Sequence, residues 1–539
     1  ISETRLVENY SRDKQEKQLQ SAYNESVRQW LQELRANVES ECLSALQAKS
    51  VALDSDAFEA LSIRNAQISI YKIRCLSVDV IDGLDFLIDT LPITIDAIPS
   101  FKHGFGSVCQ KLCEVIELCR RRGCDYSPYK GSKVSTAVST ICQQMIKFIN
   151  DFGLKGVVNN AQLEATLRKL KERLGELVNL TIRRDCQVIC DSLLHTGSNL
   201  CLKWSLLALW QLTQNDAYIC RIFVEMRKVI KRLIEIFAYN YSYSLKINCH
   251  LKSAALRVLS YLCINPDAVV QIYENLHFEK DLIANLMNER NETVLREASA
   301  LIVQLTTPFI DYTRNAKKDQ MLAKLLHQVP ISSLVLILTN ISSYTTSAEV
   351  FLLVCAALAN ISFFEVEPFI KNETLWLLIL KIKQKLNFNE ISIKDQMVTI
   401  VANISSKFPL EIVNCGNLIF LINTLQLKPL LGMQSENDLN AIERIQQKIA
   451  VALARLGAHK NVAVLIYRLN GVRRLYELCK DAKERNFSDT VLLASLAALR
   501  RISNVIGVFP LQELDALDVI NLNFRDSFLS YSCKNESYV

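Results

Sequence analysis

The chain has 539 residues, half of them hydrophobic, with only 14 Gly and 10 Pro, and its 62 basic and 56 acidic residues leave a net charge of +6. A chain this long exceeds one hydrophobic core, and so little Gly and Pro disfavours sheets joined by tight turns, so we predict an all-α protein of several domains or repeats. The mild charge, without a basic run, disfavours nucleic acid as a partner.

The 17 cysteines are spread through apolar helical patterns, for example Cys263 in LSYLCIN and Cys355 in LLVCAALAN. Buried free thiols in a reducing compartment explain this distribution better than disulfides do. There is no signal peptide and no uncharged apolar run of about 18 residues, so we expect a cytoplasmic protein without membrane insertion. The first residue is Ile1 rather than Met, and we expect a further segment before it.

The N-terminal part predicts a ligand segment rather than a domain. Residues 1–23 are polar, and we expect them to be disordered. Residues 24–49, NESVRQWLQELRANVESECLSALQAK, have apolar residues at i, i+3, i+4 and i+7, which predicts an amphipathic helix. Residues 50–60 we expect to be extended or loosely turned. Because an isolated helix of this length is marginal in water, we interpret 24–60 as a ligand ordered in a partner's groove; the alternative is a helix docked on its own domain.

The next part of the chain predicts further helices. The apolar spacing is helical over 61–90, 107–122 and 135–194, with a break at 123–131 that contains two Gly and one Pro. We expect residues 61–195 to form the N-terminal part of a helical solenoid.

From residue 200 one pattern of seven residues recurs seven times. Its second, third and sixth positions are always apolar. The copies lie 43 to 56 residues apart, a spacing typical of armadillo or HEAT repeats, in which each repeat buries its apolar face against its neighbours. We predict armadillo repeats over 196–510, a C-terminal helix and tail over 511–539, and loop-like inserts at 306–320 and 427–440. An unrelated helical bundle is the alternative. The third positions are Leu209, Leu259, Ile302, Leu358, Val401, Leu453 and Leu499.

The residue two positions after each of these is able to hydrogen-bond, and in an armadillo repeat it would face the concave groove. An amide there can pair with the backbone of an extended ligand; alternatively, Asn360 and Asn403 cap their own helices. Trp occurs only at positions 30, 204, 210 and 376, which disfavours the Trp and Asn ladder of nuclear-signal receptors. The predicted groove residues are Gln211, Tyr261, Gln304, Asn360, Asn403, Arg455 and Arg501.

The sequence has no recognisable catalytic or phosphate-binding motif. The pairs Cys109/Cys113 and Cys186/Cys190 are spaced i, i+4, so each pair shares a helical face, but no CxxC knuckle accompanies them. We interpret them as core thiols and expect no metal, no cofactor and no enzymatic activity; a helical metalloenzyme is the alternative.

The last residues predict a PDZ ligand. A PDZ groove binds a terminal carboxylate through backbone N–H groups, takes an apolar last side chain and reads a hydroxyl two residues earlier. The chain ends in a polar tail with this pattern, and a phosphate on the serine would add charge where the groove needs a neutral hydroxyl. The predicted PDZ-binding residues are Glu536, Ser537, Tyr538 and Val539.

Four stretches, SVRQWLQELRANVESECLSALQAK, EVFLLVCAALANISFF, ERIQQKIAVALARLG and SDTVLLASLAALRRIS, together with the ESYV end, resemble the inscuteable family of adaptors for oriented and asymmetric cell division. The resemblance implies a non-enzymatic adaptor at the apical cortex, with armadillo repeats and a direct link to a Bazooka-type PDZ scaffold. It also implies that the N-terminal segment binds directly in the TPR groove of Partner of Inscuteable, where the adaptor Mud competes. An inhibitory Gα subunit would be coupled indirectly, and a higher-order hetero-oligomer is left open.

Carried onto this sequence, the resemblance places the TPR contact on one helix face and the acidic residues that follow it. Because association and ordering costs offset most of the roughly 10 kcal/mol from burying five large side chains, tight binding would need an extended acidic part, about 39–59. The other function considered is an armadillo transport receptor or cargo-binding scaffold. The predicted TPR-binding residues are Val27, Trp30, Leu31, Leu34, Val38, Glu39, Glu41 and Leu46.

Overall fold

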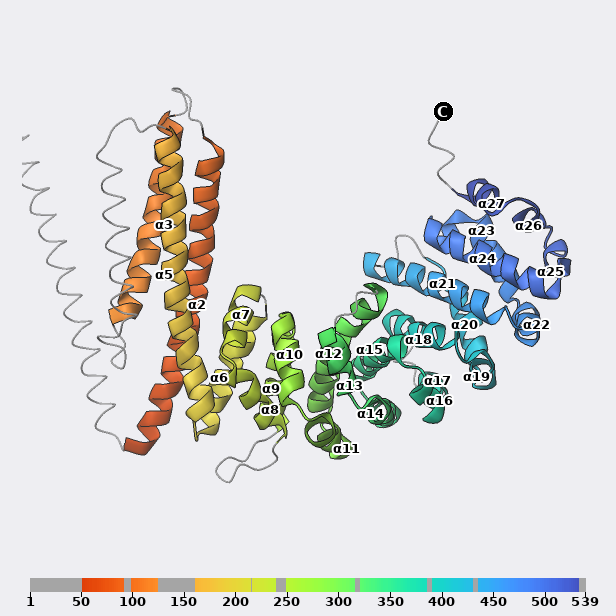
Figure 1. Ribbon diagram of the computed structural model, residues 1–539, viewed down its shortest axis with the longest axis horizontal. Coiled ribbons are helices and arrows are strands. Elements are labelled where there is room, and N and C mark those ends of the chain that lie inside the picture. The colour runs from red at the N-terminus through yellow and green to blue at the C-terminus, as the bar shows by residue number, and fades with distance from the viewer. Residues whose placement is uncertain are drawn as a thin grey trace, which may run out of the picture. The chain divides into compact units, whose positions relative to one another are not determined.

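A computed structural model describes residues 51–91, 98–124, 160–214, 216–238, 249–315, 320–384, 390–429 and 435–532 (Figure 1). Over these residues the secondary structure is helical, without a strand, as the composition predicts. They form two compact units that divide between Ser205 and Leu206. No helix in the described ranges is both long enough and apolar enough to span a lipid bilayer.

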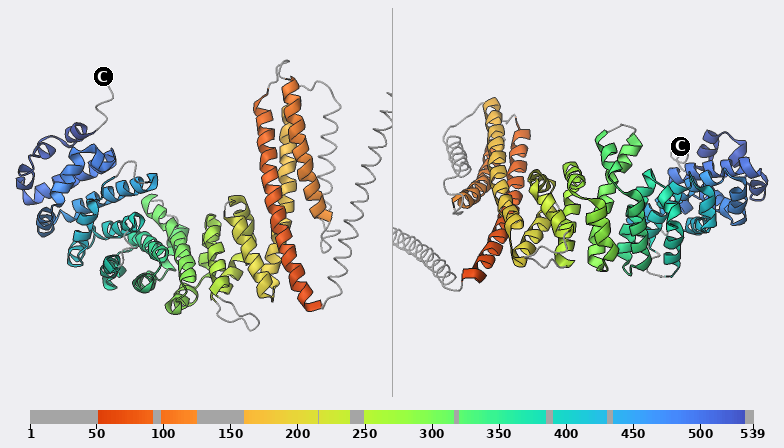
Figure 2. Two further views of the ribbon diagram at one scale, coloured as in Figure 1. Left: turned by 180° about the vertical axis from the view of Figure 1, so that it is seen from behind. Right: turned by 60° about the horizontal axis from the view of Figure 1, so that its bottom comes forward.

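The first unit is built from three long helices, α2 (Val51–Asp89), α3 (Ile98–Cys124) and α5 (Asn160–His195). Helix α2 packs against both of the others, and Figure 2 shows the three side by side from two further directions. The apolar residues of α2 recur every three or four positions, so they make one continuous buried stripe. Its members include Ile63, Ala66, Ile70, Ile73, Val80 and Leu84, none of which is exposed.

Two contacts fix the relative direction of α2 and α5. Near the end of α2, Asp85 accepts a hydrogen bond from Lys171 near the start of α5 (Nζ to Oδ2, 2.7 Å). Near the start of α2, Glu59 accepts one from Ser192 near the end of α5. The two helices are therefore antiparallel along most of their length.

The start of α2 corrects the expectation of an extended conformation for residues 50–60. Residues 51–60 are helical and belong to α2. Ala60 is buried, Glu59 is held by Ser192, and the Cys201 thiol donates to the carbonyl oxygen of Asp56 (3.3 Å). This stretch packs within the first unit because the apolar stripe of α2 begins here, which the short acidic sequence did not reveal.

The expectation that 61–195 forms the N-terminal part of the solenoid is also wrong. Helices α2, α3 and α5 contain 39, 27 and 36 residues, and they pack as a separate unit of long helices. Their uninterrupted amphipathic stripes bury against one another along the whole helix, so no short repeating pattern arises there.

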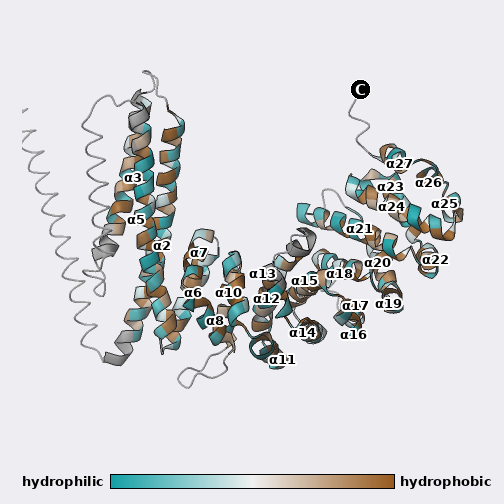
Figure 3. Ribbon diagram, in the orientation of Figure 1, coloured by the Kyte–Doolittle hydropathy of each residue, from teal (hydrophilic) through white to brown (hydrophobic). Residues whose placement is uncertain are grey.

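In the second unit, all seven copies of the recurring pattern lie on helices, which we call ladder helices. Every third-position residue is at most 1% exposed, and from α9 to α24 each ladder helix packs against the next. Each of these helices carries both hydrophobic and hydrophilic residues (Figure 3). The predicted armadillo-like solenoid is therefore confirmed. The ladder helices are α6 (Asn199–Thr213), α9 (Cys249–Leu262), α12 (Glu292–Asn315), α15 (Ala348–Phe364), α18 (Ile391–Ile404), α21 (Glu436–Leu456) and α24 (Asp489–Ile506).

Shorter helices lie between the ladder helices and complete the repeats. They are α7 (Ala217–Glu225), α8 (Lys228–Ala238), α10 (Pro266–Asn275), the π-helix η3 (Phe278–Ile283), α11 (Ala284–Asn288), α13 (Gln320–His327), α14 (Ile331–Tyr344), α16 (Glu367–Lys371), α17 (Thr374–Gln384), α19 (Pro409–Asn414), α20 (Asn417–Leu425), α22 (Lys460–Arg468), α23 (Gly471–Lys480) and the 3₁₀ helix η5 (Ala482–Arg485). After α24 follow α25 (Phe509–Gln512), α26 (Asp518–Asn521) and α27 (Phe524–Tyr531).

Local start signals explain where many of these helices begin. Ladder helices α15, α21 and α24 each follow a serine whose hydroxyl accepts a hydrogen bond from a backbone N–H of the first turn. Helices α10, α16 and α19 each carry a proline in the first turn, where its missing N–H costs nothing and its fixed φ favours helix. These prolines separate each short helix from the ladder helix before it.

Helix α12 corrects the expected insert at 306–320, because it continues to Asn315 through Pro308. An internal proline costs a helix about 3 kcal/mol or more. The next residue, Phe309, is 1% exposed and packs edge-on against Tyr273 and Phe364, with ring centroids 5.8 Å away in both cases. Burial of this ring explains why the helix continues past the proline.

Candidate binding groove on the ladder helices

The seven predicted groove residues lie at equivalent positions of the recurring pattern, one on each ladder helix; six are in the last turns of their helix, whereas Gln304 is in the middle of α12. Gln211, Gln304, Arg455 and Arg501 are exposed. Tyr261, Asn360 and Asn403 are half-buried. They therefore differ in their access to a ligand, and their role in a groove stays a prediction.

The two asparagines and Arg455 use their donors between repeats. The Asn360 amide donates to the carbonyl of Val303 (3.2 Å) and to the hydroxyl of Thr306 (3.1 Å), both on the preceding ladder helix. The Asn403 amide donates to the Ser362 hydroxyl (3.0 Å), again one ladder helix back.

Arg455 repeats this arrangement with a longer side chain, since its Nη1 donates to the carbonyl of Ala402 on α18 (2.8 Å). These bonds reach the neighbouring helix rather than the end of the residue's own helix, so neither asparagine caps its helix through them. Their amide carbonyl oxygens, rather than their N–H groups, are what a ligand could still use.

A chain of charges that the periodicity did not reveal crosses four ladder helices. Glu297 on α12 is 6% exposed and accepts hydrogen bonds from Arg257 on α9 (Nη2, 2.6 Å) and from its neighbour Arg296 (Nε, 3.1 Å). Arg257 also lies over the Trp210 ring of α6, 4.9 Å from its centroid. Arg296 continues to Glu349 on α15 (3.4 Å), and its hydrogen bond with Glu297 raises the pKa of Arg296.

A second cluster joins α18 and α21. Asp395 is 5% exposed and pairs with Lys448 (2.7 Å) and Arg444 (3.3 Å) of the next ladder helix. Lys448 also donates to the Thr399 hydroxyl (2.7 Å). Each cluster pairs a buried carboxylate with at least one cation of an adjacent ladder helix, so it fixes how the two helices pack.

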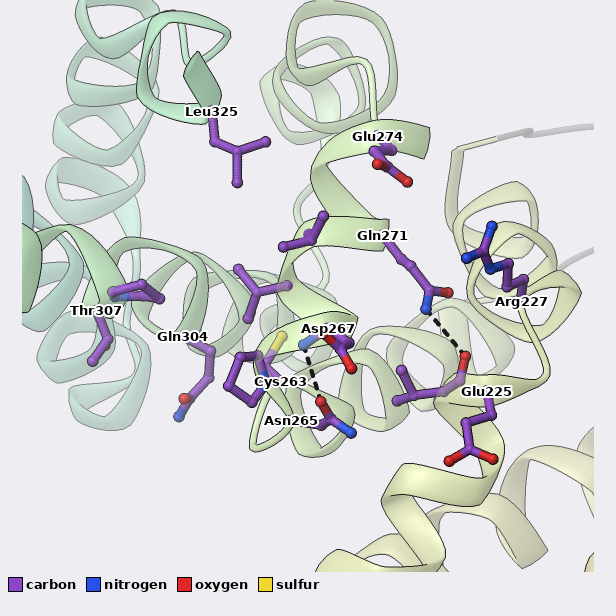
Figure 4. Close-up of a pocket in the computed structure, with 15 residues that line it drawn as sticks. Glu225, Arg227, Cys263, Asn265, Asp267, Gln271, Glu274, Gln304, Thr307 and Leu325 are labelled. Carbon is purple, nitrogen blue, oxygen red and sulfur yellow. Dashed lines mark hydrogen bonds between the residues drawn. The ribbon is translucent and has the colours of Figure 1, made fainter. Parts of the chain in front are cut away.

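A pocket of about 870 Å³ lies beside the ladder, between the end of α7, the α9–α10 junction, α10, α12 and α13 (Figure 4). Gln304, one of the predicted groove residues, is part of its lining. The pocket walls combine apolar side chains with carboxylate and amide groups, which is the usual character of a peptide or small-ligand site.

The cysteine pairs do not make a reactive or metal-binding centre in the part of the chain that the structure describes. Cys186 and Cys190 are buried in α5, whereas Cys109 and Cys113 lie on α3, where Cys109 is half-buried and Cys113 exposed. Burial raises the pKa of Cys190, and burial followed by the charge of Cys113 raises the pKa of Cys109 to about 11. Cys109 and Cys190 are therefore neutral near pH 7, and no group of three metal-ligating side chains occurs in the described ranges.

Two predicted sites lie outside the described residues, and the structure ends close to each. They are the TPR-binding face (Val27, Trp30, Leu31, Leu34, Val38, Glu39, Glu41 and Leu46) and the PDZ-binding end (Glu536, Ser537, Tyr538 and Val539).

The last described helix, α27, is held firmly against the final repeat. Arg485 is not exposed, and its guanidinium donates to the carbonyls of Leu478 and Cys479 (3.0 Å each) and of Tyr531 at the end of α27 (2.7 Å). Arg500 of α24 donates to the Ser527 hydroxyl (2.8 Å). The point from which the C-terminal tail leaves the solenoid is thus fixed.

Stacked ladder helices, inter-repeat amide bonds and a pocket beside the ladder define an armadillo-like helical-repeat protein with a preceding unit of long helices. Solved structures similar to the chain include a designed armadillo repeat protein, with 18% identity and a TM-score of 0.36 over 51% of this chain and 99% of that one. An engineered protein shows 16% identity and a TM-score of 0.39 over 78% and 99%. The profile described as Protein inscuteable C-terminal matches residues 132–539, and the chain belongs to this family.

Two curated relatives extend the likeness to nearly the whole chain. The Protein inscuteable homolog of Mus musculus is 28% identical, covering 97% of this chain and 89% of its own length. The Protein inscuteable homolog of Homo sapiens is 27% identical, covering 96% and 88%. The resemblance predicted from the quoted stretches is confirmed.

Proposed function

We propose that this chain is a non-enzymatic adaptor in asymmetric cell division and mitotic spindle orientation. Its N-terminal segment binds the TPR domain of Partner of Inscuteable, and its C-terminal tail binds a Bazooka-type PDZ scaffold at the apical cortex. An inhibitory Gα subunit is coupled through the TPR protein. The observation that carries the proposal is membership of the inscuteable family, with relatives matched over nearly the full chain.

The structure limits the length of the proposed TPR ligand. Because 51–60 are the first turns of α2 and Glu59 is held by α5, this stretch is not available as an extended peptide. We therefore assign the ligand to residues 24–50. Its acidic part is the stretch around Glu39 and Glu41, which must supply the charge and main-chain contacts that the helix alone lacks.

The alternative of an armadillo transport receptor is less well supported. Such a receptor needs ladder amides that are free to bind a cargo backbone, but Asn360 and Asn403 donate their N–H groups to the preceding ladder helix. A metalloenzyme would need ionised thiols near a further ligand, whereas burial raises the pKa of Cys190 and of Cys263.

The TPR contact is tested with peptides titrated into the purified TPR domain. Peptide 24–50 should bind at least about tenfold tighter than peptide 24–38, since burying the helix face alone does not exceed the association cost by much. Peptide 24–60 should bind no tighter than 24–50. Replacing Trp30 with Ala serves as the hot-spot control. Equal affinities for 24–38 and 24–50 would contradict the assignment.

The PDZ contact is tested in the full chain. Pull-down of a Bazooka-type PDZ domain should be lost when Glu536–Val539 are deleted and retained when residues 1–50 are deleted, with the reverse result for the TPR domain. A tail peptide phosphorylated at Ser537 should not bind, because the phosphate adds about two negative charges beside the groove. Retention of both partners after both deletions would refute the adaptor model.

A further inference from the structure

The lining of the pocket between α7 and α13 includes a residue with a buried, unpaired acceptor. The Gln271 amide donates through Nε2 to the carbonyl of Val224 (3.1 Å), which orients the group. Its other atom, Oε1, is buried and has no hydrogen-bond partner. Because Oε1 is closed off from water, a ligand N–H reaches it only when the Gln271 side chain turns toward the cavity, and a buried acceptor without a donor favours that turn. Figure 4 shows Gln271 between the helices that form the pocket.

A second acceptor lies on the opposite wall. Pro308 of α12 has no N–H, so the carbonyl of Gln304, four residues earlier, lacks its usual helical donor. Gln304, Thr307 and Pro308 all line the pocket. Backbone or side-chain N–H groups of a ligand would therefore find acceptors on two sides.

The charge of the pocket indicates which hydrogen-bond donors of a ligand would bind best. Its lining holds three acidic side chains (Glu225, Asp267 and Glu274) and one basic side chain, Arg227, so its net charge is −2. Asp267 and Glu274 are exposed and form no ion pair with any residue in the described ranges. A cation is therefore the favoured ligand group.

One face of α10 arranges these groups in a row. Asp267, Val270, Gln271 and Glu274 stand at i, i+3, i+4 and i+7, so they lie one above another. The two carboxylates are two turns apart, about 10 Å along the axis. A polyproline II segment rises about 3.1 Å per residue with three residues per turn, so side chains three residues apart span this distance on one face of the peptide.

The remaining surface of the pocket is apolar. Val224, Val269 and Leu325 line it and are at most 5% exposed, and Figure 4 shows Leu325 reaching toward α10 from α13. An apolar side chain between two basic ones would be buried against these residues.

We propose that this pocket binds a polyproline II segment of a partner protein that carries two Lys or Arg side chains three residues apart with an apolar residue between them. The basic side chains pair with Asp267 and Glu274, the apolar residue packs against Val269 and Leu325, and a peptide N–H donates to Gln271. This contact is separate from the proposed TPR and PDZ contacts, so the chain would hold a third partner.

The full chain is titrated against a fluorescent peptide whose centre is Arg-Leu-Ala-Arg, and binding is followed by anisotropy. The double variant Asp267→Asn/Glu274→Gln should weaken binding between about twofold and thirtyfold, and added salt should weaken it further. Gln271→Met, which removes the acceptor but keeps the volume, should also weaken it. Glu390→Gln, an exposed acid outside the pocket, is the matched control and should bind as the unchanged chain does.

Equal binding of a peptide with Glu in place of both Arg residues, or unchanged affinity in the double variant, would overturn the proposal. Occupation by a second copy of the chain is a different outcome that also overturns it: the peptide would not bind, and the double variant would change the sedimentation coefficient. Replacing Leu with Ser in the peptide tests the apolar contact, and undiminished affinity would contradict it.

Discussion

Removal of the Glu297 side chain should disturb the packing of the ladder helices. Its side chain is 8% exposed and accepts hydrogen bonds from Arg257 and Arg296, which continue the contacts to α6 and α15. Glu297→Ala leaves both guanidinium groups without this acceptor. The stacking of α9 on α12 should be weakened directly.

The expected loss in the free energy of unfolding depends on how well water can solvate the two cations once the carboxylate is removed. Breaking a buried ion pair costs about 3–5 kcal/mol, and a hydrogen bond to a charged group contributes about 1.5–3. The Arg257 and Arg296 side chains are 25% and 31% exposed, so water reaches both cations once the acid is gone. We therefore expect a loss of about 2 kcal/mol, below the fully buried range.

The assay is urea unfolding followed by circular dichroism, together with hydrogen exchange, because repeat arrays need not unfold in one step. Glu297→Ala should lower the midpoint and speed exchange in α9 and α12. Glu349→Ala is the matched control: its side chain is 61% exposed, so the expected loss is below about 0.5 kcal/mol. Equal losses for the two variants would refute the reasoning, as would a double-mutant cycle with Arg257→Ala that shows no coupling.

Three further outcomes follow from the inter-repeat contacts and the buried thiols. Asn360→Ala should lower the free energy of unfolding by about 1–2 kcal/mol, measured by urea titration, because acceptors on α12 lose their donor. Arg485→Ala should release α27, so that hydrogen exchange speeds up over 524–531 but not in α12; unchanged exchange there would contradict the anchoring role. Burial raises the pKa of Cys263 from 9.0 to about 12, so its contribution to stability is full below pH 9 and is lost as the pH rises toward 12. Cys263→Ala should reduce this alkaline decline of the urea midpoint.

The ladder helices could be predicted from the sequence because each repeat packs in the same way, so the same residue types recur at the same spacing. Leu358 and its equivalents occupy the same buried position in successive repeats, so the same residue types recur there. The same register gave the predicted groove positions, which stay a prediction. The partner of each polar side chain could not be predicted, because Asn360 bonds Val303, 57 residues away, and periodicity says nothing about such pairs.

In the first unit the helices could be predicted from the sequence, but the way they pack could not. Its stripes on α2 and α5 predict helices well, but a stripe does not identify the helix that covers it. The short acidic stretch at 51–60 looked extended because its few apolar residues were judged alone, whereas Ala60 and Ile63 begin a stripe that continues to Leu87. The pocket was missed for a related reason: Gln271 and Pro308 lie on different helices, and only the fold brings them to one cavity.

The anchoring of α27 restricts where a bound tail partner can sit. Seven residues separate Ser532 from the C-terminus, and a chain of that length spans at most about 25 Å when fully stretched. In the proposed PDZ contact about four of them would lie inside the groove, so the bound domain would stay close to α27. Such a short tether limits the directions in which the two bodies can rotate, and a flexible insertion after Ser532 would relax that limit without altering the binding residues.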